Sequence, residues 1–400
     1  MNIASAAHAS DDPRLVLARR LNTHLLGPVK SAFVAKDEIV DLLGVCLVAG
    51  ENLFILGPPG TAKTAVVHEL GRRLDGRVFD YLLTRFTEPN ELFGPFDIRK
   101  LRDGELVTNT EGMLPEADFV FLDELLNANS AILNSLLMVL NERVFRRGRE
   151  TRRLPLLMVV GASNRLPEDD ALAALFDRFL LRVRSDNVTD DRLAEVLAAG
   201  WSFEQTPTRD APALTLDDLQ RVRSLVREID LRGVVGEFAQ LVHRLRVAGI
   251  PVSDRRAVKL QRLIAASAVL CGRAVAELTD LWVVRYTWDV EEQREVIASL
   301  VGEVVRRGLE SAQGTAHPRA THDDGPNAEE LAADLERLAN LFARTSGEPT
   351  ATEALAAERA AAREQLGLLA GRCQWVKDET QRAYLEQQVQ ALWAAAGVAR

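Results

Sequence analysis

The 400-residue sequence has only three cysteines, no long hydrophobic run and no excess of positive charge. Cys46, Cys271 and Cys373 are far apart and odd in number, which excludes a disulfide framework and a zinc site of closely spaced ligands. No apolar run approaches the roughly 18–20 residues that cross a bilayer. Near the start, no basic segment leads into an apolar one, so a secretory signal is not expected. These absences predict a cytoplasmic protein without membrane insertion.

The charge balance is acidic, because 49 lysines and arginines face 58 aspartates and glutamates, which gives a net charge of −9. Such a balance argues against constitutive binding to nucleic acid. Residues 142–155 are an exception, with six arginines against two glutamates, and Gly148 among them predicts a hairpin. The arginines are Arg143, Arg146, Arg147, Arg149, Arg152 and Arg153.

This basic segment allows three interpretations. It could contact an acidic neighbouring subunit, hold nucleic acid in a central pore, or form a solvated face. Phe145 is the only aromatic residue within it, whereas proteins that hold single strands stack successive bases on several aromatic side chains. We therefore favour a subunit contact over nucleic acid.

The order of the apolar segments predicts an α/β domain followed by helices. Five short apolar runs alternate with amphipathic stretches, which is typical of a parallel sheet covered by helices on both faces. The runs are residues 52–56, 78–83, 119–122, 156–161 and 179–183. The predicted organisation is a disordered tail over residues 1–14, an α/β domain over 15–205, a helical lid over 206–310, a linker over 311–327 and a helical appendage over 328–400.

Three smaller features complete the predicted organisation. Pro28 is expected to interrupt a helix that begins near Leu15. The pair Asp103-Gly104 predicts a hairpin within residues 96–112. Five tryptophans are expected to be packing residues without chemistry: Trp201, Trp282, Trp288, Trp375 and Trp393.

A phosphate-binding loop is the first motif with chemical content, and it lies between a predicted strand and a predicted helix. Its residues are Gly57, Pro58, Pro59, Gly60, Thr61, Ala62, Lys63 and Thr64. In such a turn, backbone N–H groups face an anion at the helix N-terminus. Lys63 can then reach the β and γ phosphates of ATP, and the Thr64 hydroxyl can bind Mg²⁺. The strict pattern has glycine at position 62, and alanine resists a positive φ, so the match is weaker than the strict one.

Two carboxylates follow the apolar run at residues 119–122. A buried strand would place Asp123 at its carboxyl end, the edge at which ligands bind in open α/β sheets. Asp123 could hold Mg²⁺, and Glu124 could orient and deprotonate an attacking water. An Asp-Glu pair after a strand is common by chance, and the phosphate loop upstream is what favours the catalytic interpretation.

Four further polar residues are candidates for the same site. Asn164 follows the fourth apolar run, where its amide could hold the attacking water or the γ-phosphate, although a simple turn before Pro167 is the alternative. Arg178 would form an ordinary salt bridge in an isolated chain, but in a ring it could reach a neighbour's γ-phosphate. Arg255 and Arg256 open a predicted helix, where positive charge opposes the helix dipole, and this favours an anionic partner.

These motifs, in this order, resemble those of AAA+ ATPases, and more narrowly those of the MoxR family and its RavA-type subfamily. The similarity extends from about Leu15 to Leu309. It is carried by residues 56–64, 81–86, 93–95, 114–117, 121–124, 131–134, 141–143, 162–164, 166–168, 176–179 and 253–256.

The resemblance implies an α/β AAA+ P-loop core with a five-stranded parallel sheet, followed by an all-α lid and a C-terminal helical appendage. It also implies ATP and Mg²⁺ as cofactors, a hexameric ring, and a chaperone-like action on a protein client, often with a partner that bears a von Willebrand factor A domain. The hairpins at residues 96–112 and 143–153 match the family's helix-2 insert and pre-sensor-1 hairpin. By position, Lys63 and Thr64 resemble Walker A, Asp123 and Glu124 Walker B, Asn164 sensor 1, Arg178 the arginine finger, and Arg255 sensor 2, with Arg256 as its competitor.

Three functions of different kinds fit these motifs. The first is a ring-forming, Mg²⁺-dependent ATPase that remodels or activates a protein partner. The second is a motor that threads nucleic acid through an arginine-lined pore. The third, a nucleotide-gated scaffold without catalysis, is disfavoured because Lys63, Asp123 and Glu124 are all present.

Overall fold

The computed structural model describes residues 12–102, 107–147, 150–167, 170–205, 214–312, 314–321, 328–345, 361–363, 365–367, 369–371, 373, 376 and 379–395. The predicted disordered tail lies outside this part of the chain except for residues 12–14, of which Pro13 already begins helix α2 (Pro13–Arg20). The chain divides into two compact units, the first formed by Met1–Trp288 and Val304–Thr321, the second by Asp289–Glu303 and His322–Arg400. Among the described residues, no helix is both long and apolar enough to span a bilayer.

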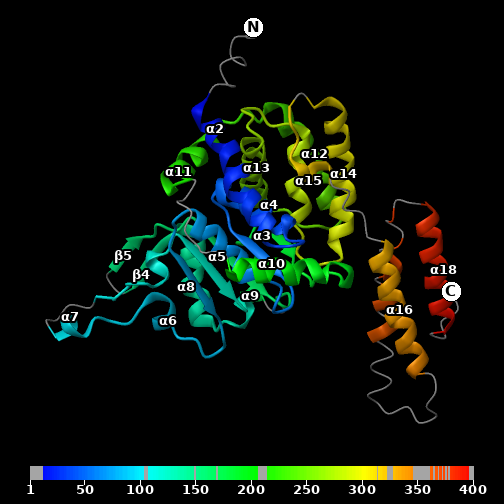
Figure 1. Ribbon diagram of the computed structural model, residues 1–400, viewed down its shortest axis with the longest axis horizontal. Helices are drawn as coiled ribbons and strands as arrows, with labels where there is room; N and C mark the ends of the chain where they lie inside the picture. Colours follow the sequence, from blue (N-terminus) through cyan, green and yellow to red (C-terminus); the bar gives the residue numbers. More distant parts are fainter. Residues whose placement is uncertain are drawn as a thin grey trace, which may run out of the picture. The chain divides into compact units, whose positions relative to one another are not determined.

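The first unit contains a five-stranded parallel sheet (Figure 1). The order of its strands is β2-β3-β6-β1-β7. Its strands are β1 (Leu53–Leu56), β2 (Val78–Leu82), β3 (Phe119–Asp123), β6 (Met158–Ser163) and β7 (Leu181–Arg184). They correspond to the five apolar runs, and β1 and β6 are buried along their whole length. The predicted α/β core with a five-stranded parallel sheet is therefore confirmed.

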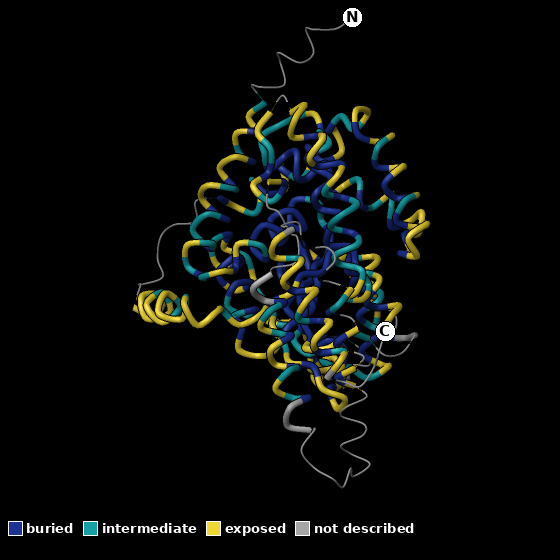
Figure 2. Tube along the Cα trace, turned by 90° about the vertical axis from the view of Figure 1, so that its right-hand side faces the viewer, coloured by how far each residue is buried: buried dark blue, intermediate teal, exposed yellow. Residues whose placement is uncertain are grey.

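Helices cover the sheet and connect its strands. Helix α4 (Asp37–Ala49) packs on β1 and β7, and α5 (Lys63–Arg73) packs on β2 and β3. The other core helices are α8 (Ser130–Glu142), α9 (Asp170–Phe176) and α10 (Leu193–Gln205), with short 3₁₀ turns at Leu125–Asn127 (η4) and Asp190–Arg192 (η5). Figure 2 shows the buried segments gathered inside, with exposed residues along the outer helices.

The predicted break at Pro28 is wrong, because the chain stays helical through it. Helix α2 continues into a π-helix, η2 (Leu21–Leu26), and then into α3 (Gly27–Ala32). Proline lacks an N–H group, so a normal helical hydrogen bond is missing at Pro28. The N–H of Gly27 donates to the carbonyl of Asn22, five residues back. This wider π-type turn keeps the chain helical despite the missing hydrogen bond at Pro28.

A helical lid follows the core, as predicted. It consists of α11 (Leu216–Leu225), α12 (Arg232–Val247), α13 (Asp254–Leu270), the 3₁₀ segment η6 (Leu278–Tyr286) and α14 (Gln293–Ser311). Helix α13 packs on α4, and Trp282 and Trp288 are buried in this part of the first unit, as expected of packing residues. Trp201 on α10 is different, because its side chain is exposed.

Part of the predicted linker is packed structure. Helix α15 (Pro318–Thr321) lies within it, and the described residue His317 before this helix is buried and stacked on Trp282 at a ring distance of 4.5 Å. Arg319 donates to the buried carboxylate of Asp41 on α4 over 3.0 Å, and Lys30 contacts the same carboxylate at 2.5 Å. The contacts of His317 and Arg319 therefore pack residues 317–321 against the rest of the first unit. Residues 313 and 322–327 lie outside the described part of the chain.

The second unit contains the first part of α14, up to Glu303, and the helices α16 (Ala328–Thr345) and α18 (Glu379–Ala395), of which the last two pack on each other. Apolar residues of these two helices form much of its core: Leu331, Leu335, Leu338, Phe342, Leu385, Val389 and Leu392. Ala362, Leu366, Leu369 and Cys373 add to the same cluster. The appendage thus has a hydrophobic core of its own.

Candidate active site

The phosphate loop joins the end of β1 to the start of α5, as predicted. The N–H of Gly57 donates to the carbonyl of Ser163 over 2.9 Å, which extends the pairing of β1 with β6 into the loop. A Cβ atom at Gly57 would lie 2.1 Å from the carbonyl oxygen of Ser185, so only glycine fits there. Ala62 has a φ of +61°, the left-handed conformation that glycine adopts most easily. The alanine therefore adopts the glycine-type backbone that the sequence suggested it would resist.

Lys63 lies inside this loop. Its ammonium group donates to the carbonyl oxygens of Gly57 and Pro58 over 2.9 and 2.7 Å. Burial lowers the pKa of Lys63, while the carboxylates of Asp123 and Glu124 act in the opposite direction. The lysine is thus held by weak backbone partners next to two acids, a position from which it can turn to an anion in the loop.

The loop has the donors that an ATP phosphate requires. Among the described residues, α5 begins without a hydrogen bond from a side-chain cap, so its first N–H groups are available to an anion. Thr64 and Asp123 offer a hydroxyl and a carboxylate, the oxygen ligands that Mg²⁺ prefers besides phosphate and water. These residues fit a magnesium–nucleotide complex.

Asp123 and Glu124 lie where β3 ends, at the same edge of the sheet as the phosphate loop. Glu124 also has a positive φ, +51°, and its N–H donates to Oδ1 of Asp123 over 3.0 Å. Non-glycine residues with this backbone are uncommon and cluster at functional sites. Burial, followed by the charge of Asp123, raises the pKa of Glu124, against smaller opposing effects of Lys63 and Arg165.

Two residues beside Glu124 were missed by the sequence analysis. The Asn127 amide donates to Oε2 of Glu124 over 3.2 Å, and its oxygen accepts a hydrogen bond from Arg165 over 3.0 Å. Asn127 lies on η4 and Arg165 follows β6, so the contact joins two neighbouring strand ends. The adjacency of Arg165 to Asn164 was the only signal of it in the sequence.

Asn164 directly follows β6, which lies between β3 and β1 in the sheet. It therefore leaves the sheet between the acidic pair and the phosphate loop, and it is exposed. The structure thus brings together at one edge the loop, Asp123, Glu124 and Asn164.

Arg178 lies at the opposite edge of the sheet. It precedes β7, and its carbonyl accepts a hydrogen bond from Asn52, the residue before β1, over 3.5 Å. Its guanidinium pairs with Asp177 at 2.9 Å. The four residues of β1 separate this edge from the phosphate loop by about 13 Å at 3.3 Å per residue. Within one chain, Arg178 is therefore not brought to the loop.

Arg255 also belongs to this distant edge. Its guanidinium donates to Oδ1 of Asn141 over 3.3 Å, in the last turn of α8. Arg143, which ends α8, in turn donates to Asn52 over 2.8 Å. Arg256 is different, because it is buried and donates to the carbonyl of Thr287. Of the two arginines, only Arg255 is accessible to a ligand or a partner.

Comparison with known proteins identifies the family. Residues 19–224 match the family described as the MoxR domain in the MoxR-vWA-beta-propeller ternary systems, and residues 233–301 match the AAA lid domain. The chain belongs to the MoxR family of AAA+ ATPases.

Three relatives are similar to half of this chain or more. Two uncharacterized proteins of Methanocaldococcus jannaschii are each 32% identical to this chain. One aligns over 285 residues, 70% of this chain and 74% of the relative, and the other over 300 residues, 69% and 79%. A structural protein of Acidianus two-tailed virus is 28% identical over 218 residues, 51% of this chain and 35% of the viral protein.

A solved structure supports the fold. The crystal structure of a candidate ATPase from Cytophaga hutchinsonii superposes with a TM-score of 0.62 and 17% sequence identity. It covers 74% of this chain and 97% of that protein.

The predicted hairpins of this MoxR protein are only partly hairpins. Strands β4 (Val144–Arg147) and β5 (Glu150–Arg153) pair antiparallel, as predicted, with Gly148 and Arg149 outside the described residues. In the other segment, residues 95–97 pair with 107–109, but Ile98–Arg102 forms helix α7 instead of continuing a strand. The predicted turn at Asp103-Gly104 lies outside the described residues.

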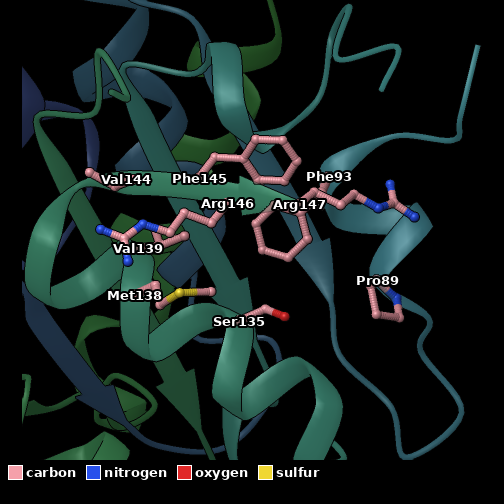
Figure 3. A pocket seen from close by; sticks show the side chains of 9 residues that line it. All are labelled: Pro89, Phe93, Ser135, Met138, Val139, Val144, Phe145, Arg146 and Arg147. Atoms are coloured by element: carbon pink, nitrogen blue, oxygen red, sulfur yellow. The ribbon is translucent and has the colours of Figure 1, made fainter. Parts of the chain in front are cut away.

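Arginines of the β4–β5 hairpin contact the predicted insert, residues 96–112, and the glycine just before it. Arg147 donates to the carbonyl of Gly94 over 2.6 Å and covers the ring of Phe96 at 4.0 Å, and Arg152 donates to Thr110 over 3.0 Å. Figure 3 shows Arg147 beside a pocket in which Phe93, on α6 (Pro89–Phe93), stacks on Phe145. This pocket of about 60 Å³ is far smaller than the several hundred Å³ of a small-molecule site. Two of the six arginines are thus engaged with the insert.

Proposed function

We propose that this MoxR protein is a Mg²⁺-dependent ATPase that forms a hexameric ring with active sites shared between subunits. It would use ATP hydrolysis to remodel or activate a protein partner in a chaperone-like way. The observation that carries this proposal is the placement of the phosphate loop at one edge of the sheet and of Arg178 and Arg255 at the other. The first edge carries the groups that would bind the nucleotide and activate water, whereas the second carries the arginines.

Within one subunit, the loop N–H groups and Lys63 bind the β and γ phosphates, after Lys63 exchanges its bonds to Gly57 and Pro58 for phosphate oxygens. Thr64 and Asp123 would hold Mg²⁺, which would offset the negative charge of the bound phosphates. Glu124 takes the proton of the attacking water, since its raised pKa makes the carboxylate a better base. Asn164 orients that water or the γ-phosphate through its side-chain amide.

The neighbouring subunit supplies positive charge. Arg178 would leave Asp177 and contact the γ-phosphoryl group across the interface, stabilising the charge that spreads over its oxygens. Arg255 would act from the same neighbour as sensor 2, because it is exposed on the same edge. Arg256 is assigned a structural role in the lid, since its guanidinium is buried against Thr287.

Mixing two inactive variants tests the shared site. Arg178→Ala retains its own Glu124, and Glu124→Gln retains its own Arg178, so each alone should hydrolyse ATP at least about 10²-fold more slowly than wild type. Random co-assembly in equal amounts should restore about one quarter of the wild-type rate, since half of the sites keep Glu124 and half of those meet an intact Arg178. A mixture no faster than its two components would overturn the shared site.

A protein that carries a von Willebrand factor A domain is the proposed partner, on the basis of the family's description. Affinity capture with Glu124→Gln and ATP should recover it. This variant binds ATP but does not hydrolyse it, so the complex with the partner should persist. Lys63→Ala, which loses the phosphate contact, is the control and should recover none. Recovery of the same proteins by both variants would contradict nucleotide-dependent capture. Among the described residues, no disulfide joins Cys46, Cys271 and Cys373, which supports the cytoplasm as the compartment. The resemblance of the motifs supports the RavA-type subfamily.

A nucleic-acid motor is the alternative. The engagement of Arg147 and Arg152 with the insert argues against it, because these guanidinium groups are not free to bind phosphate. Stimulation of the ATPase by single-stranded DNA or RNA at low salt, lost steeply as salt rises, would favour the motor. Unchanged turnover with both nucleic acids is the expected result.

A further inference from the structure

Helix α10 presents an apolar stripe to solvent. Leu193, Leu197 and Trp201 recur every four residues and therefore lie on one face of the helix. Their side chains are 49%, 67% and 68% exposed. Among the residues of α10 whose side chains are described, none is fully buried. A tryptophan and two leucines in line on one exposed face are typical of a surface that a partner covers.

The stripe lies at the edge of the sheet that carries the phosphate loop, which we call the nucleotide edge. Phe203, near the end of α10, contacts Phe33 at a ring distance of 5.4 Å. Lys36, three residues beyond Phe33, donates to Oγ of Ser185 over 3.2 Å. Ser185 in turn lies against Gly57 of the phosphate loop. Helix α10 is thus connected to the loop through three successive contacts.

A neighbouring subunit must reach this edge if Arg178 and Arg255 act in a shared site. The surface around Arg255 carries exposed apolar residues of its own. Val258, one turn further along α13, is 63% exposed, and Val247 at the end of α12 is 74% exposed. Arg246 joins the two helices by donating to Asp254 over 2.6 Å, so both valines flank the start of α13.

The two surfaces are also of opposite charge. Residues 186–205, which contain α10, hold five aspartates and glutamates against one arginine. Residues 243–262, which contain the start of α13, hold six lysines and arginines against one aspartate. Opposite potentials favour encounter of these faces and disfavour pairing of either face with itself. They therefore favour a head-to-tail contact, the kind that closes into a ring.

We propose that the stripe of Leu193, Leu197 and Trp201 packs on Val247 and Val258 of a second copy of this chain. The contact would hold the neighbour's Arg255 at the nucleotide edge, with Trp201 as its aromatic anchor. This inference rests on the proposed function, because it names the surface that would deliver the arginines. It predicts which residues touch across the interface, which the shared site alone does not.

Cysteine cross-linking of the full chain tests the contact. Trp201→Cys and Val258→Cys, mixed with ATP and Mg²⁺ and then treated with a short bismaleimide, should yield a covalent dimer. Trp201→Cys mixed with Val235→Cys should not, since Val235 is exposed elsewhere on α12. In a single chain with both Trp201→Cys and Val258→Cys, a ladder up to the full ring is expected. A product of monomer mass linked within one chain would overturn the inference, as would no product.

A positive charge placed in the stripe measures the strength of the contact. Leu197→Lys should raise the protein concentration needed for half-assembly by at least about 30-fold, because it removes a central apolar contact and repels the basic surface of the neighbour. Affinity of the dispersed chain for an ATP analogue should not change. Val235→Lys is the matched control and should assemble as wild type. Wild-type assembly of Leu197→Lys would overturn the inference.

Failure of this inference is distinguishable from failure of the proposed function. If wild type assembles and the Arg178→Ala and Glu124→Gln mixture regains activity, the shared site stands. Absent Trp201–Val258 cross-links would then overturn the α10 contact alone. If wild type does not assemble with ATP and the mixture stays inactive, the proposed function fails, and this inference fails with it.

Discussion

The side-chain amide of Asn127 donates a hydrogen bond to Oε2 of Glu124 over 3.2 Å, while its oxygen accepts one from Arg165 over 3.0 Å. Because Arg165 can only donate, it fixes the amide with its nitrogen toward the carboxylate. Glu124 itself has a left-handed backbone at the end of β3. The proposed base is thus oriented by a residue of the next turn.

Asn127→Ala should slow hydrolysis about tenfold, equivalent to about 1.4 kcal/mol in the barrier, because Glu124 loses the partner that orients it. Affinity for ATP should stay the same, since the Asn127 side chain is hydrogen-bonded to Glu124 and Arg165. Steady-state kinetics and equilibrium binding measure the two effects. Asn340→Ala, an exposed amide on α16, is the control. Equal losses in both variants would contradict an orienting role.

The pH dependence of hydrolysis should report the raised pKa of Glu124. A carboxyl with a raised pKa takes up its proton at a higher pH, so the base is lost earlier as the pH falls. The acidic limb of kcat should therefore lie above the ordinary value of 4.5. Asn127→Asp, which adds a negative charge beside Glu124, should move this limb to still higher pH. A limb that stays in place in Asn127→Asp would argue against Glu124 as the titrating base.

The left-handed backbone of Ala62 predicts an ordered series of substitutions. Ala62→Gly should retain ATP affinity and stability, because glycine adopts this φ without steric cost. Ala62→Val should lower the free energy of unfolding by at least about 1 kcal/mol and weaken ATP binding, since a β-branched side chain is strained there. Denaturant unfolding and nucleotide binding measure both. If Ala62→Val were as stable as Ala62→Gly and bound ATP as tightly, the loop would not need this conformation.

Alanine substitutions of Arg255 and Arg256 should have different effects on stability and turnover. Arg255→Ala should leave the free energy of unfolding unchanged and slow turnover only in assembled protein. Arg256→Ala should lower the free energy of unfolding by about 1–3 kcal/mol, because the Thr287 carbonyl loses a buried donor. Chemical denaturation and ATPase assays at several protein concentrations separate the two. A stable Arg256→Ala with slow turnover would exchange their proposed roles.

His317 should make the fold sensitive to acid. Burial lowers its pKa from 6.5 to about 4, against the opposing charge of Asp41 and with smaller lowering effects of Lys30, Arg319 and Arg273. The unfolded chain therefore binds a proton below pH 6.5 that the folded chain does not take up until about pH 4. Stability is retained above pH 6.5 and decreases as the pH falls through this range, by up to about 3 kcal/mol.

Unfolding by denaturant at several pH values tests this dependence. His317→Gln should reduce the slope of unfolding free energy against pH between 6.5 and 4 by about one proton. His243→Gln, at an exposed position of α12, should leave the slope unchanged. An unchanged slope in His317→Gln would show that the histidine does not control the acid sensitivity.

Much of the nucleotide edge could be predicted from the sequence because it depends on local order. Once the five apolar runs are parallel strands, the residues after them must gather at one edge, and this places Asp123 and Asn164 near Lys63. The contacts that escaped prediction depend on packing between distant segments. Arg165 meets Asn127 only because β6 and β3 are neighbours, and Arg255 lies at the far edge because α13 packs on α4.

Predictions from local sequence patterns were also wrong where the same residues allow two backbone conformations. Pro28 signals a helix break, yet a single wider turn keeps the chain helical. Asp103-Gly104 signals a hairpin, but the arm before it is helix α7. The exposure of Trp201 could not be read from composition, because tryptophan is usually well buried.

The phosphate loop and the arginines lie at opposite edges of one sheet, so under the proposed function each chain would carry two half-sites that meet only between chains. In the proposed ring, the rate per chain then depends on encounters between chains and should vanish on dilution. A scarce or newly made protein would bind ATP without consuming it. The cell could thus control the consumption of ATP through the abundance of the protein alone.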